Sequence, residues 1–527
     1  MEARGSDVAD LESPRSPPVR ALSVYEKFEG NNAVNPFSNL TIDLSNGTTA
    51  ILVISGLVLF VPRLVTLLLG ILLMAIFGNL ATLGISTKQL EEEPLPCWRK
   101  VLRYPAEFGV RLLFFSMGVW WISEVGHKAT ATEAPIVVAN HSAFLDLMLI
   151  WARRSATVSA ALNAKLPVLG PLARSFQFIF VDRKDKDSRS KTMDEIAKRA
   201  GDPRWPQTAI FPEGTTTNAT AIIAFKKGPF VPGKPVQPIA IKYHWERWGV
   251  DPSFVVGKPG MGLLGLRLMC IPWLTVTMTY LPVLEPSHEE KADPSLFARR
   301  AQEAMAESLG VPTAMHSFDD VQLAIAAYKQ NLPVSAGSVE FKAIKGALND
   351  IDVKTAKGYL ERFAALEGSK TNGGLISKDE FSSLMQKEAQ AGSGSGFKSG
   401  EIDRLFFLLD DDQSGALDFR KFLVIMAFVN GDGVDNRREA LRLAFRVFDD
   451  QDTGAISTAV LADILHRGLP SADLSELTAL ANGADADSDG QVTYEDFFAF
   501  AEANAGQLSA FKSSFFGAIE EEAPNGS

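Results

Sequence analysis

A histidine and an aspartate five positions apart, His141 and Asp146, follow the short apolar run 134–139. A β-branched run of that length predicts a strand, which places the histidine at a strand end. A carboxylate about one helical turn away can orient an imidazole and stabilise its protonated form, as a general base near neutral pH requires. The spacing alone is weak evidence, because a surface histidine beside a helix-capping aspartate shows the same pattern.

Two further polar segments also follow predicted strands. Residues 211–218 combine the carboxylate of Glu213, the close backbone approach that Gly214 permits, and hydroxyls such as that of Thr215 that can bind phosphate oxygens. Arg183 follows another apolar run, and an arginine at such an edge suits a bidentate grip on phosphate. The combination favours a functional site over a chance arrangement.

Short β-branched runs alternate with helical stretches between about residues 125 and 285, which indicates an α/β domain with a largely buried sheet. The runs that predict strands are 134–139, 176–181, 208–211, 236–241 and 274–281. Sites in such folds lie where strands end, and all three polar segments fall at such ends.

The motifs, in this order, resemble those of the glycerolipid acyltransferase superfamily related to 1-acylglycerol-3-phosphate acyltransferase. His141 and Asp146 match the family's HX4D motif, residues 178–183 match its second motif, and residues 211–215 match its third, FPEGT. The fourth, a proline inside an apolar strand, matches residues 236–241. Four motifs in order across about a hundred residues make a specific signal.

The resemblance implies transfer of a fatty acyl group from acyl-CoA to the free hydroxyl of a lysophospholipid. His141 would remove the hydroxyl proton, and Asp146 would hold the imidazole and stabilise its charge. The acceptor would be positioned by Arg183, Glu213, Gly214 and Thr215. No serine or cysteine nucleophile is required.

An almost continuously apolar stretch runs from residue 50 to 85, and its part 64–85 alone can span the ~30 Å hydrocarbon core of a bilayer. The Pro62-Arg63 pair leaves open a kink, a hairpin or an interfacial lead-in helix. The stretch 108–122 suits either a membrane-dipping helix or a buried helix. The stretch 263–273 is expected to be a domain-packed or membrane-facing surface rather than a span.

Acidic residues are concentrated towards the carboxyl terminus. The whole chain has 63 Asp+Glu, 52 Lys+Arg and a net charge of -11, whereas residues 401–527 alone hold 24 acidic and 9 basic residues. Nucleic-acid-binding proteins normally carry a basic surface, so no nucleic-acid partner is expected. Past residue 333 or so, a helical pattern with acidic, glycine-containing loops predicts an all-α module.

The loop 485–496 has the spacing of an EF-hand calcium site, which needs oxygen ligands at alternate positions, a glycine at position 6 and a carboxylate at position 12. The expected Ca²⁺ ligands are Asp485, Asp487, Asp489, Gln491 and Asp496. The final aspartate is shorter than the usual glutamate, which should weaken selectivity for Ca²⁺ over Mg²⁺.

Three other loops depart further from the pattern. The loop 410–421 ends in a lysine, and its weaker candidate ligands are Asp410, Asp412, Ser414 and Ala416. The loop 449–460 ends in valine and is expected to bind nothing, and the loop 369–380 lacks the first three acids. Such loops usually work in pairs, so packing alone explains the two weakest.

The order of a membrane segment, an acyltransferase domain and EF-hands resembles the lysophosphatidylcholine and plant-type lysophosphatidylethanolamine acyltransferases. This resemblance implies phospholipid remodelling at the endoplasmic reticulum or Golgi, with acyl-CoA, lysophospholipids and membrane phospholipids as partners. The catalytic and EF-hand domains would face the cytosol, and a response to Ca²⁺ stays open. Cys97 and Cys270 fit folding in a reducing compartment.

Two other functions compete with remodelling. One is acylation of lysophosphatidic acid in de novo synthesis, and the other is a calcium-responsive membrane adaptor whose acyltransferase fold is catalytically dead. The intact motif residues count against the adaptor. The sequence leaves the headgroup, the acyl chain and the oligomeric state open.

The predicted organisation has six parts. They are a disordered arm (1–48), a transmembrane or re-entrant segment (49–86), a membrane-proximal linker with an amphipathic helix (87–124), the α/β acyltransferase domain (125–325), an EF-hand module of two pairs (326–505) and a tail (506–527).

Overall fold

The computed structural model describes residues 35–146, 154–182, 186–342, 352–390, 402, 406, 410, 414–429, 445, 454–468 and 473–503. One compact unit holds residues 35–436, and a second holds residues 437–514. The predictions made for residues 1–34, Arg183, Asp412 and the tail 506–527 lie outside the described residues.

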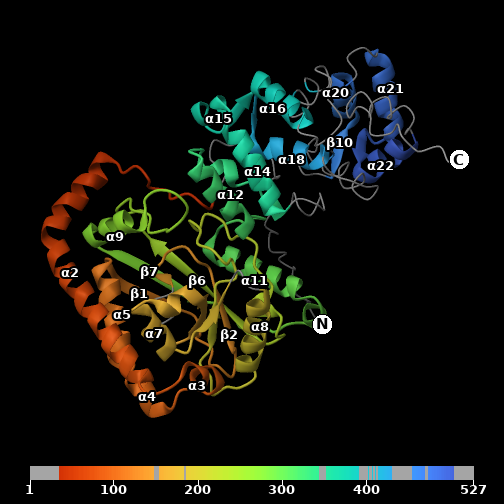
Figure 1. The fold of residues 1–527 in the computed structure, drawn as a ribbon. Helices are drawn as coiled ribbons and strands as arrows, with labels where there is room; N and C mark the ends of the chain where they lie inside the picture. Colours follow the sequence, from red (N-terminus) through yellow and green to blue (C-terminus); the bar gives the residue numbers. More distant parts are fainter. Residues whose placement is uncertain are drawn as a thin grey trace, which may run out of the picture. The chain divides into compact units, whose positions relative to one another are not determined.

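The first unit is built on a seven-stranded sheet in the order β1-β7-β6-β2-β5-β3-β4 (Figure 1). Every neighbouring pair is parallel except β6 with β7. The strands are β1 (Val119–Val125), β2 (Ile136–Ala139), β3 (Ala156–Ala160), β4 (Ile179–Val181), β5 (Thr208–Ile210), β6 (Val236–His244) and β7 (Leu274–Tyr280). A sheet dominated by parallel pairs confirms the α/β class.

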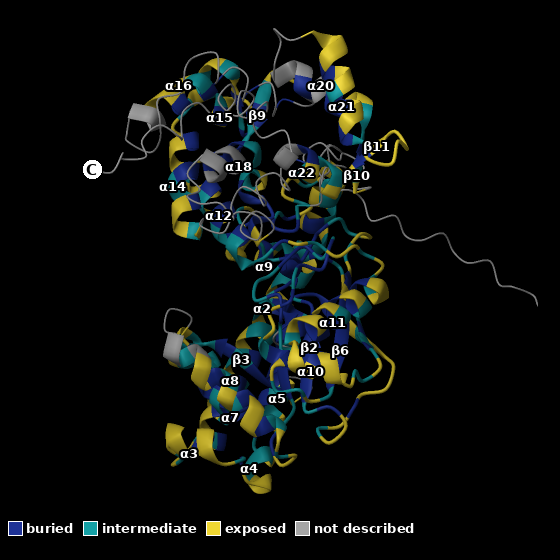
Figure 2. Ribbon diagram, turned by 90° about the vertical axis from the view of Figure 1, so that its right-hand side faces the viewer, coloured by how far each residue is buried: buried dark blue, intermediate teal, exposed yellow. Residues whose placement is uncertain are grey.

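Helices cover both faces of this sheet, so its central strands are buried on both sides (Figure 2). Val137 and Ala139 of β2 join a core with α2, α5, α7 and α9, whereas Ile136 and Val138 join a core with α8 and α11. This alternation follows from the two-residue period of a strand. The helices of the domain are α2 (Asn46–Thr82), α3 (Thr87–Glu92), α4 (Cys97–Val101), α5 (Tyr104–Ser116), α7 (Leu169–Ser175), α8 (Lys186–Ala200), α9 (Met261–Cys270), α10 (His288–Ala292), α11 (Pro294–Leu309) and α12 (Phe318–Lys329).

Among the described residues, α2 is the one helix long and apolar enough to cross a membrane, with a mean hydropathy of 2.5 over its best window. It continues through Pro62 without a break, so the hairpin alternative is wrong. One face of α2 packs on the domain, and the remaining apolar side chains are exposed. The exposed side chains include Val53, Ile54, Leu57, Val58, Val61, Val65, Leu68 and Leu72.

Polar contacts fix α2 to the end of α9. The Arg63 guanidinium is buried and donates to the carbonyl oxygens of Met269, Ile271 and Pro272 at 2.9, 2.5 and 2.8 Å. The last carbonyls of a helix lack partners within the helix, and here α2 supplies their donors. The stretch 263–273 is therefore a packed helix end with an exposed apolar face, as predicted.

The prediction of a linker over residues 87–124 is wrong for its last residues. Residues 119–124 belong to β1, which is an edge strand of the main sheet. The apolar stretch 108–122 divides at Gly118, where α5 has ended and β1 begins. Gly118 has a φ of +80°, and a β-carbon there would lie 2.9 Å from Ile271 Cγ1. Only glycine adopts that turn without strain.

Residues 35–45 also differ from the prediction of a disordered arm. Asn39 donates to the carbonyl oxygens of Asp251 and Ser253 at 3.1 and 2.9 Å, and the side chain of Asn218 donates to the carbonyl oxygens of Asn35 and Ser38. These bonds satisfy backbone groups that would otherwise be unpaired, and they tie the segment to the loops after β5 and β6.

The boundary predicted at residue 326 falls inside α12. In the first unit, β8 (Leu375–Ser377) pairs with β9 (Ala416–Asp418), and the helices around them are α14 (Val353–Ala364), α15 (Glu367–Thr371), α16 (Lys378–Gln390) and α18 (Phe419–Val429). In the second unit, β10 (Ala455–Ser457) pairs with β11 (Gln491–Thr493) beside α20 (Thr458–Gly468), α21 (Leu474–Ala484) and α22 (Tyr494–Ala503). The four calcium-type loops therefore form two pairs, and the pairs belong to different units.

Candidate active site

Strand register brings the first and third motifs together. Val138 of β2 lies opposite Ile210 of β5, a separation of 72 residues, and the chain beyond both strands leaves the sheet at the same edge. His141 and Glu213 are separated by the same 72 residues, and the His141 N–H donates to Glu213 Oε1 at 2.8 Å. The parallel pairing therefore places two distant motifs in contact.

His141 and Asp146 form a hydrogen-bonded dyad. The Nδ1 atom of His141 lies 3.0 Å from Asp146 Oδ2, and the side chains are 16% and 0% exposed. With a proton on Nδ1 shared with the carboxylate, Nε2 is the acceptor nitrogen, and it makes no hydrogen bond to the described residues. A neutral imidazole held in this tautomer can accept a proton from a substrate hydroxyl.

The Asp146 carboxylate accepts hydrogen bonds from three donors besides His141. The backbone N–H groups of Ser142 and Ala143 donate to Oδ2 at 2.6 and 2.8 Å, and the Tyr243 hydroxyl donates to Oδ1 at 2.7 Å. Burial first, and the negative charge of Asp146 second, raise the pKa of Tyr243 well above its usual value, so Tyr243 stays a neutral donor. This tyrosine, which lies on β6, was missed by the sequence reasoning.

Glu213, which the resemblance placed among the acceptor-positioning residues, has a fully buried side chain. Its carboxyl group accepts the His141 N–H and a backbone hydrogen bond from Ile223, and the Thr217 hydroxyl lies 3.4 Å away. Burial raises the pKa of Glu213 to about 8, with the charge of Asp146 adding to the increase. In this structure the Glu213 carboxyl group therefore holds the backbone of His141.

The rest of the third motif surrounds the dyad. The ring of Phe211 stacks on the His141 imidazole at 4.2 Å between centroids, and the Thr217 N–H donates to the His141 carbonyl at 2.8 Å. Gly214 turns the loop with a φ of +73°. Thr215 is half-buried, and its hydroxyl makes no hydrogen bond to the described residues.

Asn140 fixes the end of β2 against β6, which carries the fourth motif. Its side chain donates to the Ile241 carbonyl at 3.0 Å and accepts from the Ile241 N–H at 2.7 Å. A buried asparagine with both groups paired acts as an extra rung of the sheet. The sequence signal for it was a polar residue directly after an apolar strand.

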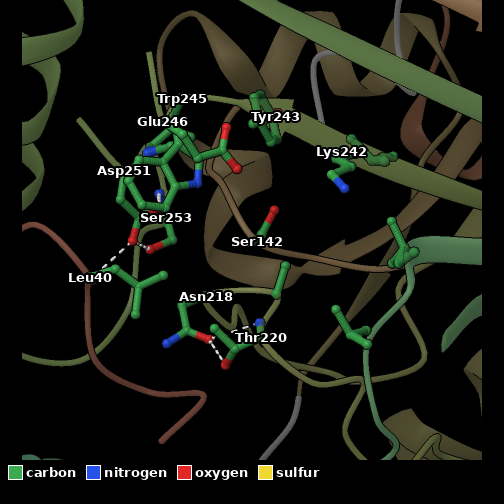
Figure 3. A pocket seen from close by; sticks show the side chains of 15 residues that line it. Leu40, Ser142, Asn218, Thr220, Lys242, Tyr243, Trp245, Glu246, Asp251 and Ser253 are labelled. Atoms are coloured by element: carbon green, nitrogen blue, oxygen red, sulfur yellow. Dashed lines mark hydrogen bonds between the residues drawn. The ribbon is translucent and has the colours of Figure 1, made fainter. Parts of the chain in front are cut away.

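A cavity of about 330 Å³ lies beside the dyad (Figure 3). Ser142 and Tyr243 belong to its wall, whereas His141 and Glu213 do not line it. Figure 3 shows Asp251 and Ser253 on one side and Asn218 and Thr220 below. Its other lining residues are Leu40, Ala219, Ile241, Lys242, Trp245, Glu246, Pro252, Leu309 and Val311.

The calcium-type loops keep the expected turn. The sixth position of each loop is a glycine in the left-handed region, with φ between +70° and +93° at Gly374, Gly415, Gly454 and Gly490. In the loop 485–496, carboxylate oxygens of Asp485, Asp487 and Asp489 lie within 4.8 Å of one another. Oxygens that bind one Ca²⁺ at 2.3–2.6 Å lie within about 5 Å of each other, so this donor set fits the ion.

The weaker loop is arranged differently. Asp410 is buried, and its carboxylate accepts from the Ser414 hydroxyl at 3.1 Å and from the Gly415 N–H at 2.9 Å. Ala416 of the weaker loop begins β9. In the stronger loop, the carboxylate of Asp496 accepts hydrogen bonds from the N–H and the hydroxyl of Thr493. Gln491, at position 7 of the stronger loop, begins β11.

Comparison with known proteins gives two family models and a group of curated relatives. The model described as Acyltransferase matches residues 123–242, and the model described as EF-hand domain pair matches residues 372–427. Mouse lysophosphatidylcholine acyltransferase 2 is 34% identical over 474 residues, which is 89% of this chain and 82% of the relative. Human lysophosphatidylcholine acyltransferase 1 is 33% identical over 471 residues, which is 89% of this chain and 85% of the relative.

A solved structure, the 1-acyl-sn-glycerophosphate acyltransferase of Thermotoga maritima, is 18% identical, with a TM-score of 0.29, and the match covers 45% of this chain and 94% of that one. The curated relatives carry the assignment, because they extend over the acyltransferase domain and the EF-hands alike. This chain is an acyltransferase and belongs to the family of the lysophosphatidylcholine acyltransferases.

Proposed function

We propose that this chain transfers a fatty acyl group from acyl-CoA to the free hydroxyl of a lysophospholipid in membrane phospholipid remodelling. The observation that carries the proposal is the dyad, in which His141 Nδ1 lies 3.0 Å from a buried Asp146 carboxylate and Nε2 stays available. The names of the relatives point to lysophosphatidylcholine as acceptor, and lysophosphatidylethanolamine is the other headgroup that we propose.

The proposed reaction is a direct transfer. His141 Nε2 accepts the proton of the acceptor hydroxyl as its oxygen attacks the thioester carbonyl carbon. The carbon–sulfur bond then breaks, the ester forms, and CoA leaves with the proton that His141 returns to its thiolate. Asp146 stabilises the imidazolium between these two steps, and Tyr243 with two backbone N–H groups holds Asp146 in place.

We further propose that Ca²⁺ binds the loop 485–496 and, more weakly, the loop 410–421. A cation bound at the weaker loop would act close to the catalytic domain through a chain of contacts. Arg420, in that loop, lies 3.8 Å from Glu340, and the neighbouring N–H groups of Val339 and Phe341 donate to Asp320 of α12 at 3.2 and 2.9 Å. Calcium modulation of the activity would follow this route.

Membrane association rests on α2, and we propose the endoplasmic reticulum or Golgi with both the catalytic and EF-hand domains on the cytosolic side. This orientation places the dyad where acyl-CoA is dissolved. Protease treatment of sealed microsomes tests it, because a carboxyl-terminal tag should be digested without detergent. A protected tag would contradict the orientation.

The function is tested by offering labelled acyl-CoA and a panel of lysophospholipids to membranes that contain the wild type or His141→Ala. We expect labelled phospholipid from lysophosphatidylcholine or lysophosphatidylethanolamine with the wild type and almost none with the variant. A preference for lysophosphatidic acid would favour de novo synthesis, and no transfer to any acceptor would favour an adaptor. Equal rates with Ca²⁺ and with a chelator would contradict calcium modulation.

A further inference from the structure

A lysine that no motif includes lies against the catalytic loop. A β-carbon built on Gly214 would be 2.3 Å from the Nζ atom of Lys226, so the ammonium group lies directly over the backbone of the loop. The Lys226 N–H donates to the Pro212 carbonyl at 2.8 Å, which fixes the lysine to the same loop. The loop thus has a cation on the face that glycine leaves open.

This loop also packs against the general base. The Gly214 N–H donates to the Phe211 carbonyl at 3.1 Å, and the Phe211 ring stacks on His141. The Lys226 ammonium and the His141 imidazole therefore both pack against the loop 211–214. On its other side, the Lys226 Nζ lies 4.7 Å from the ring centroid of Phe318, the first residue of α12.

The chemistry of the acceptor calls for a positive charge at such a place. In a lysophospholipid with a free central hydroxyl, the phosphorus is only four covalent bonds from the oxygen that His141 deprotonates. The phosphates of acyl-CoA lie beyond the long pantetheine arm, far from the thioester. A cation on the loop that packs against His141 therefore fits the acceptor phosphate and not the CoA phosphates.

The carboxyl group of Glu213, in the same loop, is engaged with the backbone of His141. Its side chain is fully buried and directed at the His141 N–H, and its raised pKa keeps it largely protonated at neutral pH. Lys226 itself is exposed, and an ammonium on a flexible stem can follow a phosphate as a point charge.

We propose that Lys226 binds the phosphate of the acceptor and is a specificity-determining residue of this site. The inference rests on the proposed lysophospholipid acylation. Lys226 would be a second basic residue of the acceptor site, for which the sequence motifs supplied Arg183 alone.

Lys226→Met removes the charge and keeps the length of the side chain, so steady-state kinetics of the full chain in mixed micelles test the proposal. We expect the KM for lysophosphatidylcholine to rise by about tenfold or more, as loss of one charge-assisted contact predicts. The KM for acyl-CoA should stay within about twofold, because its phosphates bind elsewhere, and kcat should change less than the acceptor KM.

Lys226→Arg keeps the charge and should restore most of the acceptor affinity. Lys227→Met is the matched control, because it removes an adjacent exposed lysine and should leave every constant unchanged. Melting temperatures of all variants report on folding. If Lys226→Met is unstable, Lys226→Gln, which keeps a polar side chain on the surface, takes its place.

A rise confined to the KM for acyl-CoA, an equal loss in Lys226→Met and Lys226→Arg, or no change in either constant would overturn the proposal. These outcomes differ from failure of the proposed function, in which the wild type itself acylates no lysophospholipid.

Discussion

Replacing Glu213 by glutamine should change how stability depends on pH. The carboxyl group is fully buried, and burial raises its pKa from 4.5 to about 8. The folded state therefore binds a proton that the unfolded state releases between these two pH values. A group with a raised pKa contributes its full stability below the unfolded pKa and loses it as the pH rises through the folded pKa.

The magnitude follows from the size of the shift. One unit of pKa corresponds to about 1.4 kcal/mol, so the wild type should lose roughly 3 kcal/mol of stability between pH 5 and pH 8 through this group alone. Glutamine has the same shape and stays neutral, so its contribution to stability does not change with pH. The free energy of unfolding of Glu213→Gln should therefore rise relative to that of the wild type across this range.

Melting temperatures of the two proteins in one detergent, measured from pH 5 to pH 9, give the comparison. We expect the difference to move in favour of Glu213→Gln by several degrees as the pH rises. Measuring the difference between variants cancels the titration of all other groups. A difference that stays constant, or that moves in favour of the wild type, would refute the assignment of Glu213 as a buried, protonated support of His141.

Two further predictions concern the support of Asp146 and the calcium loops. Tyr243→Phe removes one of the hydrogen-bond donors to Asp146. We expect kcat to fall about five- to tenfold, as the loss of about 1 kcal/mol predicts, with a smaller change in KM. An unchanged kcat would show that the hydroxyl is dispensable. Asp485→Ala should reduce Ca²⁺ binding much more than Asp449→Ala does, because the loop 485–496 keeps three acids and a terminal carboxylate whereas the loop 449–460 does not. Calorimetry on the full chain measures both. Equal effects would contradict this ranking.

The strands that the sequence predicted are those with dense β-branched runs, and β2, β5, β6 and β7 lie within a few residues of their expected bounds. Two strands were missed for physical reasons. β3, with the sequence ATVSA, contains small residues that carry little apolar signal. β1, with VWWISEV, continues an apolar helix in sequence, and only its distant pairing with β7 makes it a strand.

The residues of the candidate site likewise divide into those that the sequence predicted and those that it did not. His141 and Asp146 were predictable because their chemistry and spacing are local, and the structure places them together. Tyr243 and Lys226 were not, because they reach the site through strand pairing and loop packing over long separations. Glu213 was found as a motif residue, but its role depends on the direction of its side chain, which the loop geometry decides.

The central claim is that His141 activates the acceptor hydroxyl for direct attack on the thioester. Release of CoA thiol, measured with and without lysophosphatidylcholine in the wild type and in His141→Ala, tests it most directly. The account predicts that release requires the acceptor, shows no acceptor-independent burst and falls by about a hundredfold or more in the variant. A stoichiometric burst of CoA without acceptor, or full activity of His141→Ala, would contradict it.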